Sequence, residues 1–268
     1  MKQRIFIAPA LYVAGILLPV YWLILLSLKT NAEITAGFSF WPQSLNFSNF
    51  QFIFSNPDWY FGYVNALIYA GMNVIISITV ALPSAYAFSR YNFFGQRGLF
   101  FGLLMFRMLA PAILLAPFVQ IFSDLGLIDT HIAVAIAHCF FNVPLAIWIL
   151  EGFISAIPRQ IDQSAMIDGY SRLGLFVKFI FPQLRTGISV AAFFCFMFSW
   201  IEFMLANALT TINAKPIAGI ITRAASVLSG DLSLLAAASI VGLAPGVLII
   251  FLMRKNLAAG FSMGRLID

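Results

Sequence analysis

The sequence predicts an all-α membrane protein with six transmembrane helices and both termini in the cytoplasm. Three observations lead to this prediction. Of the 268 residues, 62% are hydrophobic and only 9% are charged, whereas an ordinary soluble domain carries roughly 25% charged residues. Apolar runs of about 20 residues, the length that crosses a bilayer, recur along the chain. The basic residues are distributed unevenly between the loops on alternate sides of these runs.

The first apolar run follows Lys2 and Arg4, and we interpret it as a retained span. It is longer than the core of a signal peptide, about 7–15 residues, and no small-x-small cleavage site follows it. A cleaved secretory signal is the alternative. The six predicted spans are residues 5–28, 62–89, 98–122, 130–151, 186–206 and 234–253.

The distribution of lysine and arginine decides the orientation of these spans, because loops that stay in the cytoplasm carry an excess of both. Three basic residues fall on one side, namely Lys29, Lys215 and Arg223. On the other side lie Lys2, Arg4, Arg90, Arg97, Arg159, Arg172, Lys178, Arg185, Arg254, Lys255 and Arg265. That side is predicted to be cytoplasmic. These residues are scattered between apolar runs and form no basic stripe, so a nucleic-acid partner is not expected.

The first external loop, about residues 29–61, is rich in aromatic side chains, which is typical of a segment at the level of the lipid headgroups. Contact with an external partner is the alternative. The aromatic residues are Phe38, Phe40, Trp41, Phe47, Phe50, Phe52, Phe54, Trp59 and Tyr60. Together with the first span, this loop forms the predicted N-terminal region, residues 1–61.

Prolines lie within the predicted spans, where they favour kinks or local unwinding. Among these prolines are Pro111, Pro117, Pro144 and Pro245. Unwound backbone of this kind exposes carbonyl groups, and in a transport protein those groups would suit a polyhydroxylated solute.

The long segment between the fourth and fifth spans, residues 151–185, predicts a short helix on the cytoplasmic side. Pro158 suits the first turn of a helix, and Ser155 upstream is a candidate cap. Helical spacing then continues to Asp168. Gly169 follows and predicts a stop or bend, because glycine readily adopts a left-handed backbone.

A second short helix is predicted after this glycine. Helical spacing resumes over residues 171–179, and Pro182 ends or kinks the helix. Two short helices joined at a glycine make a rigid element that another protein could hold. An amphipathic hairpin resting on the bilayer surface is the alternative, and the residues alone do not decide between the two.

The residues of this segment resemble the cytoplasmic "EAA" loop of permeases from binding-protein-dependent ABC importers. The matching residues are Ile157-Pro158, Gln163-Ser164-Ala165-Met166-Ile167-Asp168-Gly169, Phe176, Ile180 and Phe181-Pro182. The chain departs from the family pattern at three of its positions. Gln163 and Ser164 stand where Glu and Ala are usual, and Tyr170 stands where Ala is usual.

The resemblance extends along almost the whole chain and is closest to the maltose-type, carbohydrate-uptake branch. The branch commonly has Asn at the position of Ile201, so the role of that Asn is not carried over. The other matching strings are Phe40-Trp41-Pro42, Asn49-Phe50, Asn65-Ala66-Leu67, Ala85-Tyr86-Ala87-Phe88, Gly95-Gln96-Arg97, Leu125-Gly126-Leu127-Ile128-Asp129-Thr130, Trp200-Ile201-Glu202-Phe203 and Gly260-Phe261-Ser262-Met263-Gly264.

The resemblance implies the type I ABC importer transmembrane fold in a bacterial cytoplasmic (inner) membrane. It divides the chain into the N-terminal region, a five-helix permease core at 62–254 that includes the loop 151–185, and a cytoplasmic tail at 255–268. The implied partners are a second homologous permease, two ATPase subunits and an external solute-binding protein. The implied cargo is a small carbohydrate or polyol. The residues implied in coupling to the ATPases are Gln163, Ser164, Ala165, Met166, Asp168 and Gly169.

No phosphate loop of the form G-x-x-x-x-G-K-[ST] is present in the sequence, and such a loop is what cradles the phosphates of ATP in many ATPases. We therefore expect no cofactor on this chain and no enzymatic activity, with ATP and Mg²⁺ bound by the partner ATPases.

Apart from Glu151 at the very end of the fourth span, two charged residues lie within the predicted spans, where a charge is costly unless it is paired or faces water. Arg107 lies near the middle of the third span, and Glu202 lies in the fifth, toward its outer end. We expect the two to form an ion pair between helices or to line the solute path together.

His131 and His138 are seven residues apart and so share one helical face, but a pair falls short of the three or four ligands of a zinc site. We expect them in the core or at an interface, not in a metal site. Cys139 and Cys195 lie in apolar runs with neither disulfide nor metal-site spacing, where a thiol behaves as a small hydrophobic group.

Two other functions remain as alternatives. A stand-alone channel or secondary transporter for a small neutral solute would usually show an internal repeat, and neither half of the sequence is a copy of the other. An intramembrane enzyme would need convergent catalytic groups such as His-Glu-x-x-His or a Ser/Lys or Asp pair, and none is visible.

Overall fold

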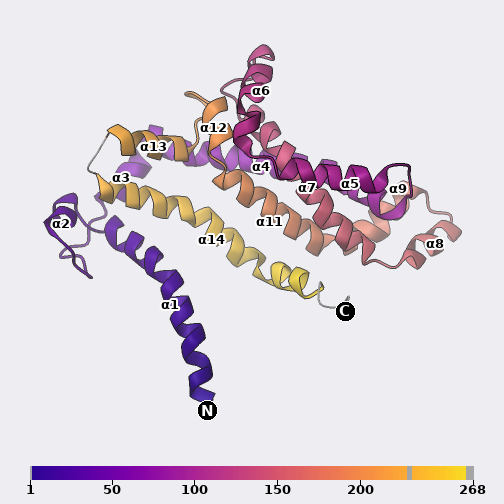
Figure 1. Cartoon of the computed structure of the whole chain (residues 1–268), viewed down its shortest axis with the longest axis horizontal. Helices are drawn as coiled ribbons and strands as arrows, with labels where there is room; N and C mark the ends of the chain where they lie inside the picture. The colour runs from indigo at the N-terminus through magenta and orange to yellow at the C-terminus, as the bar shows by residue number, and fades with distance from the viewer. Residues whose placement is uncertain (1, 228–230, 264–268) are drawn as a thin grey trace. The chain divides into compact units, whose positions relative to one another are not determined.

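The computed structural model describes residues 2–227 and 231–263 and is helical throughout, with no strand among the described residues (Figure 1). The all-α prediction is confirmed. The helices are α1 (Lys2–Ser27), α2 (Asn31–Ala36), α3 (Ser48–Ser55), α4 (Pro57–Arg90), α5 (Gln96–Arg107), α6 (Pro111–Asp124), α7 (His131–Ser155), α8 (Arg159–Ile167), α9 (Arg172–Leu175), the π-helix η1 (Phe176–Ile180), α10 (Phe181–Gln183), α11 (Arg185–Ile201), α12 (Met204–Leu209), α13 (Ile217–Val227) and α14 (Leu232–Met263).

Three described helical segments are long and apolar enough to cross a membrane, namely α4, α7 and residues Leu232–Leu257 of α14. Two bent helix pairs raise the number to five if each pair counts as one span. The described apolar part of α1, Leu11–Ser27, is shorter. The number of six spans therefore stays a prediction, and so does the cytoplasmic position of the termini. Residues 264–268 of the predicted tail lie outside the described residues, and α14 continues to Met263.

The third predicted span, 98–122, is not one straight helix. α5 ends at Arg107 and α6 begins at Pro111, with a bend of 92° between them. Pro111 has no N–H to continue the α5 hydrogen-bond ladder, and it disfavours helical backbone at the residue before it. Ala110 accordingly has an extended backbone, with φ −69° and ψ 132°.

The proline prediction thus holds at Pro111, where the helix breaks. Pro117, Pro144 and Pro245 lie inside helices that continue past them. Helix α13 was not expected, because it occupies a stretch predicted to be an external loop.

The chain forms two compact units. The first combines Met1–Val64 with Pro216–Val247 and the second combines Asn65–Lys215 with Leu248–Asp268. In the first unit the Tyr63 hydroxyl donates to the Ala238 carbonyl at 2.6 Å. Asn49 Nδ2 donates to Ser233 Oγ at 2.9 Å. These bonds tie together parts of the unit that are far apart in sequence.

In the second unit α7 is the central helix, because it packs against both α5 and α11. Gly187 of α11 lies so close to α7 that an added Cβ would come within 2.7 Å of Phe153. Small residues at such contacts let two backbones approach closely, which favours helix association in lipid. We infer that α7 and α11 form the rigid core on which the rest of this unit depends.

A carboxylate joins two loops of the second unit. Asp129, between α6 and α7, has a left-handed backbone with φ 63°. Its side chain accepts hydrogen bonds of 2.9–3.2 Å from backbone N–H groups, and the donors are those of Thr211, Ile212, Asn213 and Ala214. Its own N–H donates to the Leu209 carbonyl at 2.8 Å. Partial burial raises the pKa of the Asp129 carboxyl, but these N–H donors outweigh burial and hold the pKa well below its usual range.

We predict that Asp129→Ala lowers the thermal unfolding midpoint of the detergent-purified chain by several degrees, because it leaves these N–H groups without their acceptor. Asp129→Asn is the matched control, since Asn tolerates left-handed backbone and keeps one acceptor oxygen. The folded-state pKa lies below the unfolded value of about 3.9, so the stabilisation is present above about pH 4 and is lost as the pH falls further. A midpoint difference between wild type and Asp129→Asn that does not shrink on acidification would contradict this account.

Candidate functional site

The predicted cytoplasmic segment folds into two short helices joined at a glycine, as expected. α8 begins after Pro158 and ends at Ile167, Asp168 is its C-cap residue, and Gly169 has φ 83°. The N–H of Gly169 donates to the Met166 carbonyl at 3.1 Å, and the N–H of Tyr170 donates to the Ala165 carbonyl at 3.0 Å. This pair of bonds is the Schellman arrangement, which ends a helix at a left-handed glycine.

The cap predicted at Ser155 is not formed. Ser155 is the last residue of α7, and its hydroxyl contacts Ser89 Oγ at 2.7 Å and Glu151 Oε1 at 2.6 Å. The second helix of the segment is also less regular than predicted. α9 ends at Leu175 and continues as the π-helix η1, and a bend of 75° separates α10 from α11, two residues after Pro182.

The inner face of this segment is packed against the ends of the predicted spans. Ala165, Leu175 and Ile180 are at most 2% exposed and belong to the same apolar cluster as residues of α4 and α7. Asp162 on α8 forms an ion pair with Arg90 at the end of α4, with 3.1 Å between Oδ2 and Nη2. The segment is therefore fixed to the second unit and does not hang from it as a flexible loop.

The outer face of the same segment carries exposed apolar side chains. Ile167 is 86% exposed and Leu173 is 73% exposed. Met166 and Tyr170 are also exposed, as are the polar residues Gln163, Ser164 and Asp168. We call this set of seven residues the outer face of the loop. Of the six residues implied in coupling, Ala165 alone points into the core.

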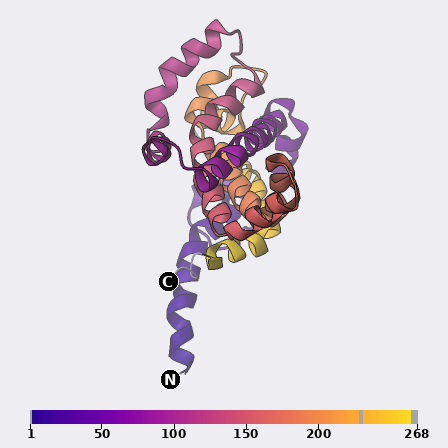
Figure 2. The ribbon, with the colours of Figure 1, turned by 90° about the vertical axis from the view of Figure 1, so that its right-hand side faces the viewer.

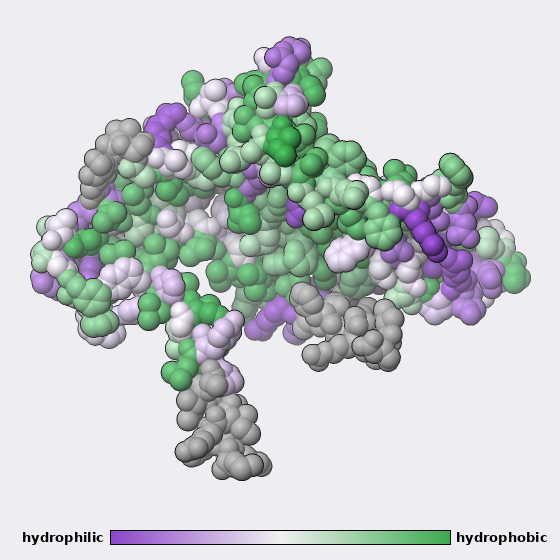
Figure 3. All heavy atoms as spheres, viewed as in Figure 1, coloured by the Kyte–Doolittle hydropathy of each residue, from purple (hydrophilic) through white to green (hydrophobic). Residues whose placement is uncertain are grey.

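Figure 3 shows hydrophilic side chains gathered over the end of the second unit that carries α8 and α9, whereas the neighbouring helices present apolar surface. Figure 2 views the molecule from that end. This change in polarity is what a segment projecting from apolar spans requires, since the polar side chains then lie in water.

Arg107 lies at the last residue of α5, and its guanidinium carbon is 4.6 Å from the ring centroid of Phe198 on α11. Two features of this position favour the positive charge. The C-terminal end of a helix carries partial negative charge, and the face of an aromatic ring attracts a cation. The side chain is neither fully buried nor fully exposed.

The predicted span 186–206 placed Glu202 inside a helix, but in the structure it lies outside one. α11 ends at Ile201, and Glu202 has an extended backbone at the start of the turn into α12. Its carboxylate accepts hydrogen bonds from the N–H groups of Leu205 and Ala206 at 3.1–3.2 Å, and so caps α12.

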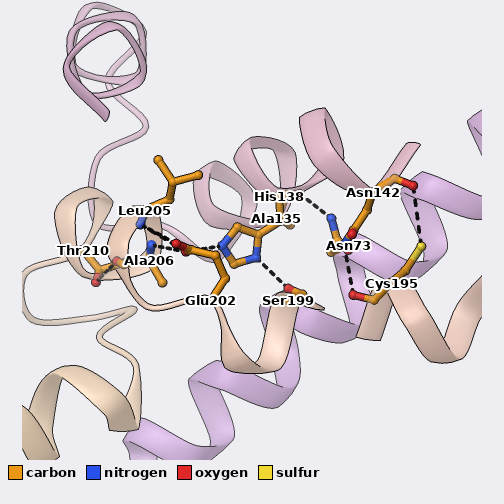
Figure 4. Close-up of polar contacts among 10 residues, drawn as sticks. All are labelled: Asn73, Ala135, His138, Asn142, Cys195, Ser199, Glu202, Leu205, Ala206 and Thr210. Atoms are coloured by element: carbon orange, nitrogen blue, oxygen red, sulfur yellow. Dashed lines mark hydrogen bonds and ion pairs between the residues drawn. The ribbon is translucent and has the colours of Figure 1, made fainter. Parts of the chain in front are cut away.

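Glu202 also contacts His138, whose Nε2 lies 3.0 Å from Glu202 Oε2, while His138 Nδ1 lies 2.7 Å from Ser199 Oγ (Figure 4). His138 is fully buried. In the described part of the chain, the pair between Arg107 and Glu202 that the sequence suggested is not formed, because the carboxylate is held by His138 and by α12.

A second polar cluster lies along α7, toward Cys195. Asn142 Nδ2 donates to Asn73 Oδ1 at 2.6 Å and to the Cys195 carbonyl at 3.0 Å, and Asn73 Nδ2 donates to the Ala135 carbonyl (Figure 4). Both Asn side chains are fully buried. Sequence reasoning did not single them out, although a polar residue inside an apolar run was the available signal.

The two histidines have separate roles as hydrogen-bonding residues. His131 Nε2 lies 2.8 Å from Asn65 Oδ1, whereas His138 binds Ser199 and Glu202. No group of three or more metal-ligating side chains is found among the described residues. Cys139 and Cys195 are free and buried.

Comparison with known proteins identifies the family. The sequence profile of the binding-protein-dependent transport system inner membrane component matches residues 77–262. The chain is 27% identical to the sulfoquinovosyl glycerol transport system permease protein SmoH of Agrobacterium fabrum, over 99% of this chain and 94% of that protein. It is 29% identical to the trehalose transport system permease protein SugB of Mycobacterium tuberculosis, over 95% and 93% of the two proteins.

Among solved structures, the chain resembles one in the crystal structure of a bacterial ABC transporter involved in the import of the acidic polysaccharide alginate. The TM-score is 0.77 at 20% sequence identity, and the match covers 95% of this chain and 97% of the other. At this identity the likeness shows the fold, and the profile match over more than half of the chain shows the family. The chain belongs to the inner membrane components of binding-protein-dependent transport systems, and it is a transport subunit and not an enzyme.

Proposed function

We propose that the chain is one of two permease subunits of an ATP-driven importer for a small carbohydrate or polyol in a bacterial cytoplasmic membrane. The relatives SmoH and SugB are named as permeases of transport systems for sulfoquinovosyl glycerol and for trehalose, which supports this class of cargo. The proposal includes six spans with cytoplasmic termini, a second permease, two ATPase subunits that bind ATP and Mg²⁺, and an external solute-binding protein.

The observation that carries the proposal is the construction of the α8–α9 loop. Its inner face is fixed to α4 and α7, and its outer face carries exposed apolar residues, including Ile167 at 86% and Leu173 at 73%. Exposed apolar groups beside polar ones are typical of a surface that another protein covers. We assign this outer face to the ATPase and its side chains to coupling, with Gln163, Ser164, Met166 and Asp168 as contacts and Gly169 as the fixed turn.

The mechanism follows from how the loop is attached. When the ATPases close on ATP, the force on α8 passes through the ion pair between Asp162 and Arg90 to α4. It passes through the packed side chains of Ala165 and Leu175 to α7. Because these contacts are buried and close-packed, the spans move with the loop as a body and rock between inward-open and outward-open arrangements.

The direct test is purification of the tagged chain from its native membrane in mild detergent, followed by mass spectrometry and an ATPase assay. We expect an ATPase and a second permease to co-purify, with ATP hydrolysis that rises when the external binding protein and its sugar are added. Recovery of the chain alone, or only as a homo-oligomer, would favour a stand-alone channel or secondary transporter instead.

We propose Arg107 as a solute-path residue, because it is a partly exposed cation beside the break between α5 and α6, over an aromatic ring. An Arg and an aromatic face together suit a polyhydroxylated ligand, since the guanidinium offers five N–H donors. Glu202, held by His138 and α12, is assigned instead to fixing the break after α11.

We predict that Arg107→Gln lowers the rate of solute uptake by about tenfold, the cost of one lost charge-assisted hydrogen bond. The amount of assembled transporter and its basal ATP hydrolysis should stay unchanged. The measurement is uptake of radiolabelled sugar into proteoliposomes. Arg97→Gln, on the exposed surface, is the matched control. Unchanged uptake in Arg107→Gln would remove Arg107 from the solute path.

A further inference from the structure

A cavity with both charged and apolar lining residues lies between the end of α4 and the loop formed by α8 and α9. Its volume is about 200 Å³. Its lining comes entirely from the second unit and consists of Tyr86, Arg90, Tyr91, Arg159, Asp162, Gln163, Met166, Arg172 and Leu175. We call this cavity the arginine pocket, because three of its lining residues are arginines.

The charges in the arginine pocket do not balance. Three arginines face one acid, Asp162, and the carboxylate of Asp162 is engaged by Arg90 and by the hydroxyl of Tyr86 at 3.2 Å. Two positive charges therefore remain without an acidic partner in the pocket. Such an excess favours an anion, and an anion of two charges would neutralise it.

Arg90 has a buried donor left over. Its side chain is only 7% exposed, and Nη2 serves both Asp162 and the Ile157 carbonyl, the latter at 2.9 Å. Within this ion pair, the Nε–H of Arg90 and the Oδ2 of Asp162 are both buried without a hydrogen-bond partner. Unsatisfied buried atoms are costly, so the Arg90–Asp162 pair is under-satisfied where it borders the pocket, and the guanidinium keeps donors that its present contacts do not use.

The other two arginines are exposed but held in position. Arg159 Nη2 donates to the Ser89 carbonyl at 3.0 Å. Arg172 Nη1 donates to the Tyr91 hydroxyl at 3.1 Å, and its guanidinium carbon is 5.2 Å from the Tyr91 ring centroid. Each guanidinium has five N–H donors, so one contact each orients the group and leaves most of its donors available. Such planar, pre-oriented forks match the oxygens of a phosphate group.

We propose that the arginine pocket binds a phosphate group, supplied either by the headgroup of an acidic phospholipid or by a soluble phosphate compound. Arg90, Arg159 and Arg172 are its ligands, with the Gln163 amide and the Tyr91 hydroxyl at the rim. A bound phosphate joins the end of α4 to both short helices of the loop, and it therefore stiffens the loop. All lining residues of the pocket belong to this chain. The phosphate proposal can therefore be tested, and rejected, independently of the importer proposal.

The test uses the full chain in nanodiscs of phosphatidylcholine. Inorganic phosphate is titrated against chloride at equal ionic strength, with binding followed by calorimetry and by the thermal unfolding midpoint. A second set of nanodiscs contains phosphatidylglycerol and no added phosphate. Stabilisation in the first set identifies a soluble anion as ligand, and stabilisation in the second set identifies a lipid headgroup.

The variants are Arg159→Gln and Arg172→Gln, both at exposed side chains and therefore compatible with folding. We expect each to weaken binding by about tenfold, and Arg172→Lys to retain part of the affinity. Arg97→Gln, an exposed cytoplasmic-side arginine outside the pocket, should bind as wild type does. The proposal is overturned if neither phosphate nor phosphatidylglycerol stabilises the wild type, or if Arg97→Gln loses as much binding as the pocket variants.

Discussion

Gly169→Pro should abolish sugar uptake driven by the binding protein while the chain still reaches the membrane. Gly169 has φ 83°, whereas proline is locked near −65°, and its N–H donates to the Met166 carbonyl, a bond that proline cannot make. The turn between α8 and α9 cannot then form. A cost of about 3 kcal/mol corresponds to roughly a hundredfold loss of the correctly turned loop.

The damage should stay local, because nothing lies within 4 Å of an added Cβ at Gly169. Three substitutions separate backbone geometry from other effects. Gly169→Asn should retain most uptake, since Asn tolerates left-handed backbone, and Gly169→Ala should be intermediate at about 1 kcal/mol. The measurements are uptake, ATP hydrolysis with and without binding protein, and the amount of chain in the membrane. A Gly169→Pro transporter whose hydrolysis still responds to the binding protein would refute the coupling role of the loop.

The α8–Gly169–α9 turn could be predicted from the sequence because its causes are local. A proline at the start of a helix and a left-handed glycine at its end act within a few residues, and each has a strong conformational preference. The long apolar helices α4, α7 and α14 could be predicted for a similar reason, since length and hydropathy alone decide whether a segment is long and apolar enough to cross a bilayer.

The contacts of the charged residues could not be predicted in the same way. Glu202 and His138 are 64 residues apart, and only the packing of α7 against α11 brings them together. The break after Ile201 contains no proline or glycine, so the sequence gives no sign that the helix predicted over 186–206 ends there. The position of the Glu202 carboxylate is explained by this break, because the first N–H groups of α12 need hydrogen-bond acceptors and the carboxylate supplies them.

The break at Pro111 could be predicted only in part from the sequence. The proline signalled a disturbance, but neither the bend of 92° nor the resulting position of Arg107 at a helix end followed from it. Whether a proline kinks a helix or breaks it depends on what the neighbouring helices offer to the freed carbonyl groups. Pro144, inside the buried α7, remains within a continuous helix.

Glu202→Ala should lower the stability of the chain more than Asp129→Ala does, because the lost contacts are buried. It leaves His138 buried without its acidic partner, and it removes the acceptor for the N–H groups of Leu205 and Ala206. Each buried donor that loses its acceptor costs about 1–3 kcal/mol, so these losses together cost about 3 kcal/mol or more, which corresponds to a fall of roughly 6–12 °C in the thermal unfolding midpoint.

Glu202→Gln is the matched control, because its amide oxygen still accepts from the α12 backbone, and we expect a loss of about 1 kcal/mol. The double variant Glu202→Ala/His138→Gln should lose less stability than the sum of the losses in the two single variants, since residues in direct contact do not act independently. The midpoint is measured in detergent, and uptake in proteoliposomes. A Glu202→Ala chain that keeps its midpoint but loses uptake would contradict the structural role of Glu202 at the break and would return this residue to the solute path beside Arg107.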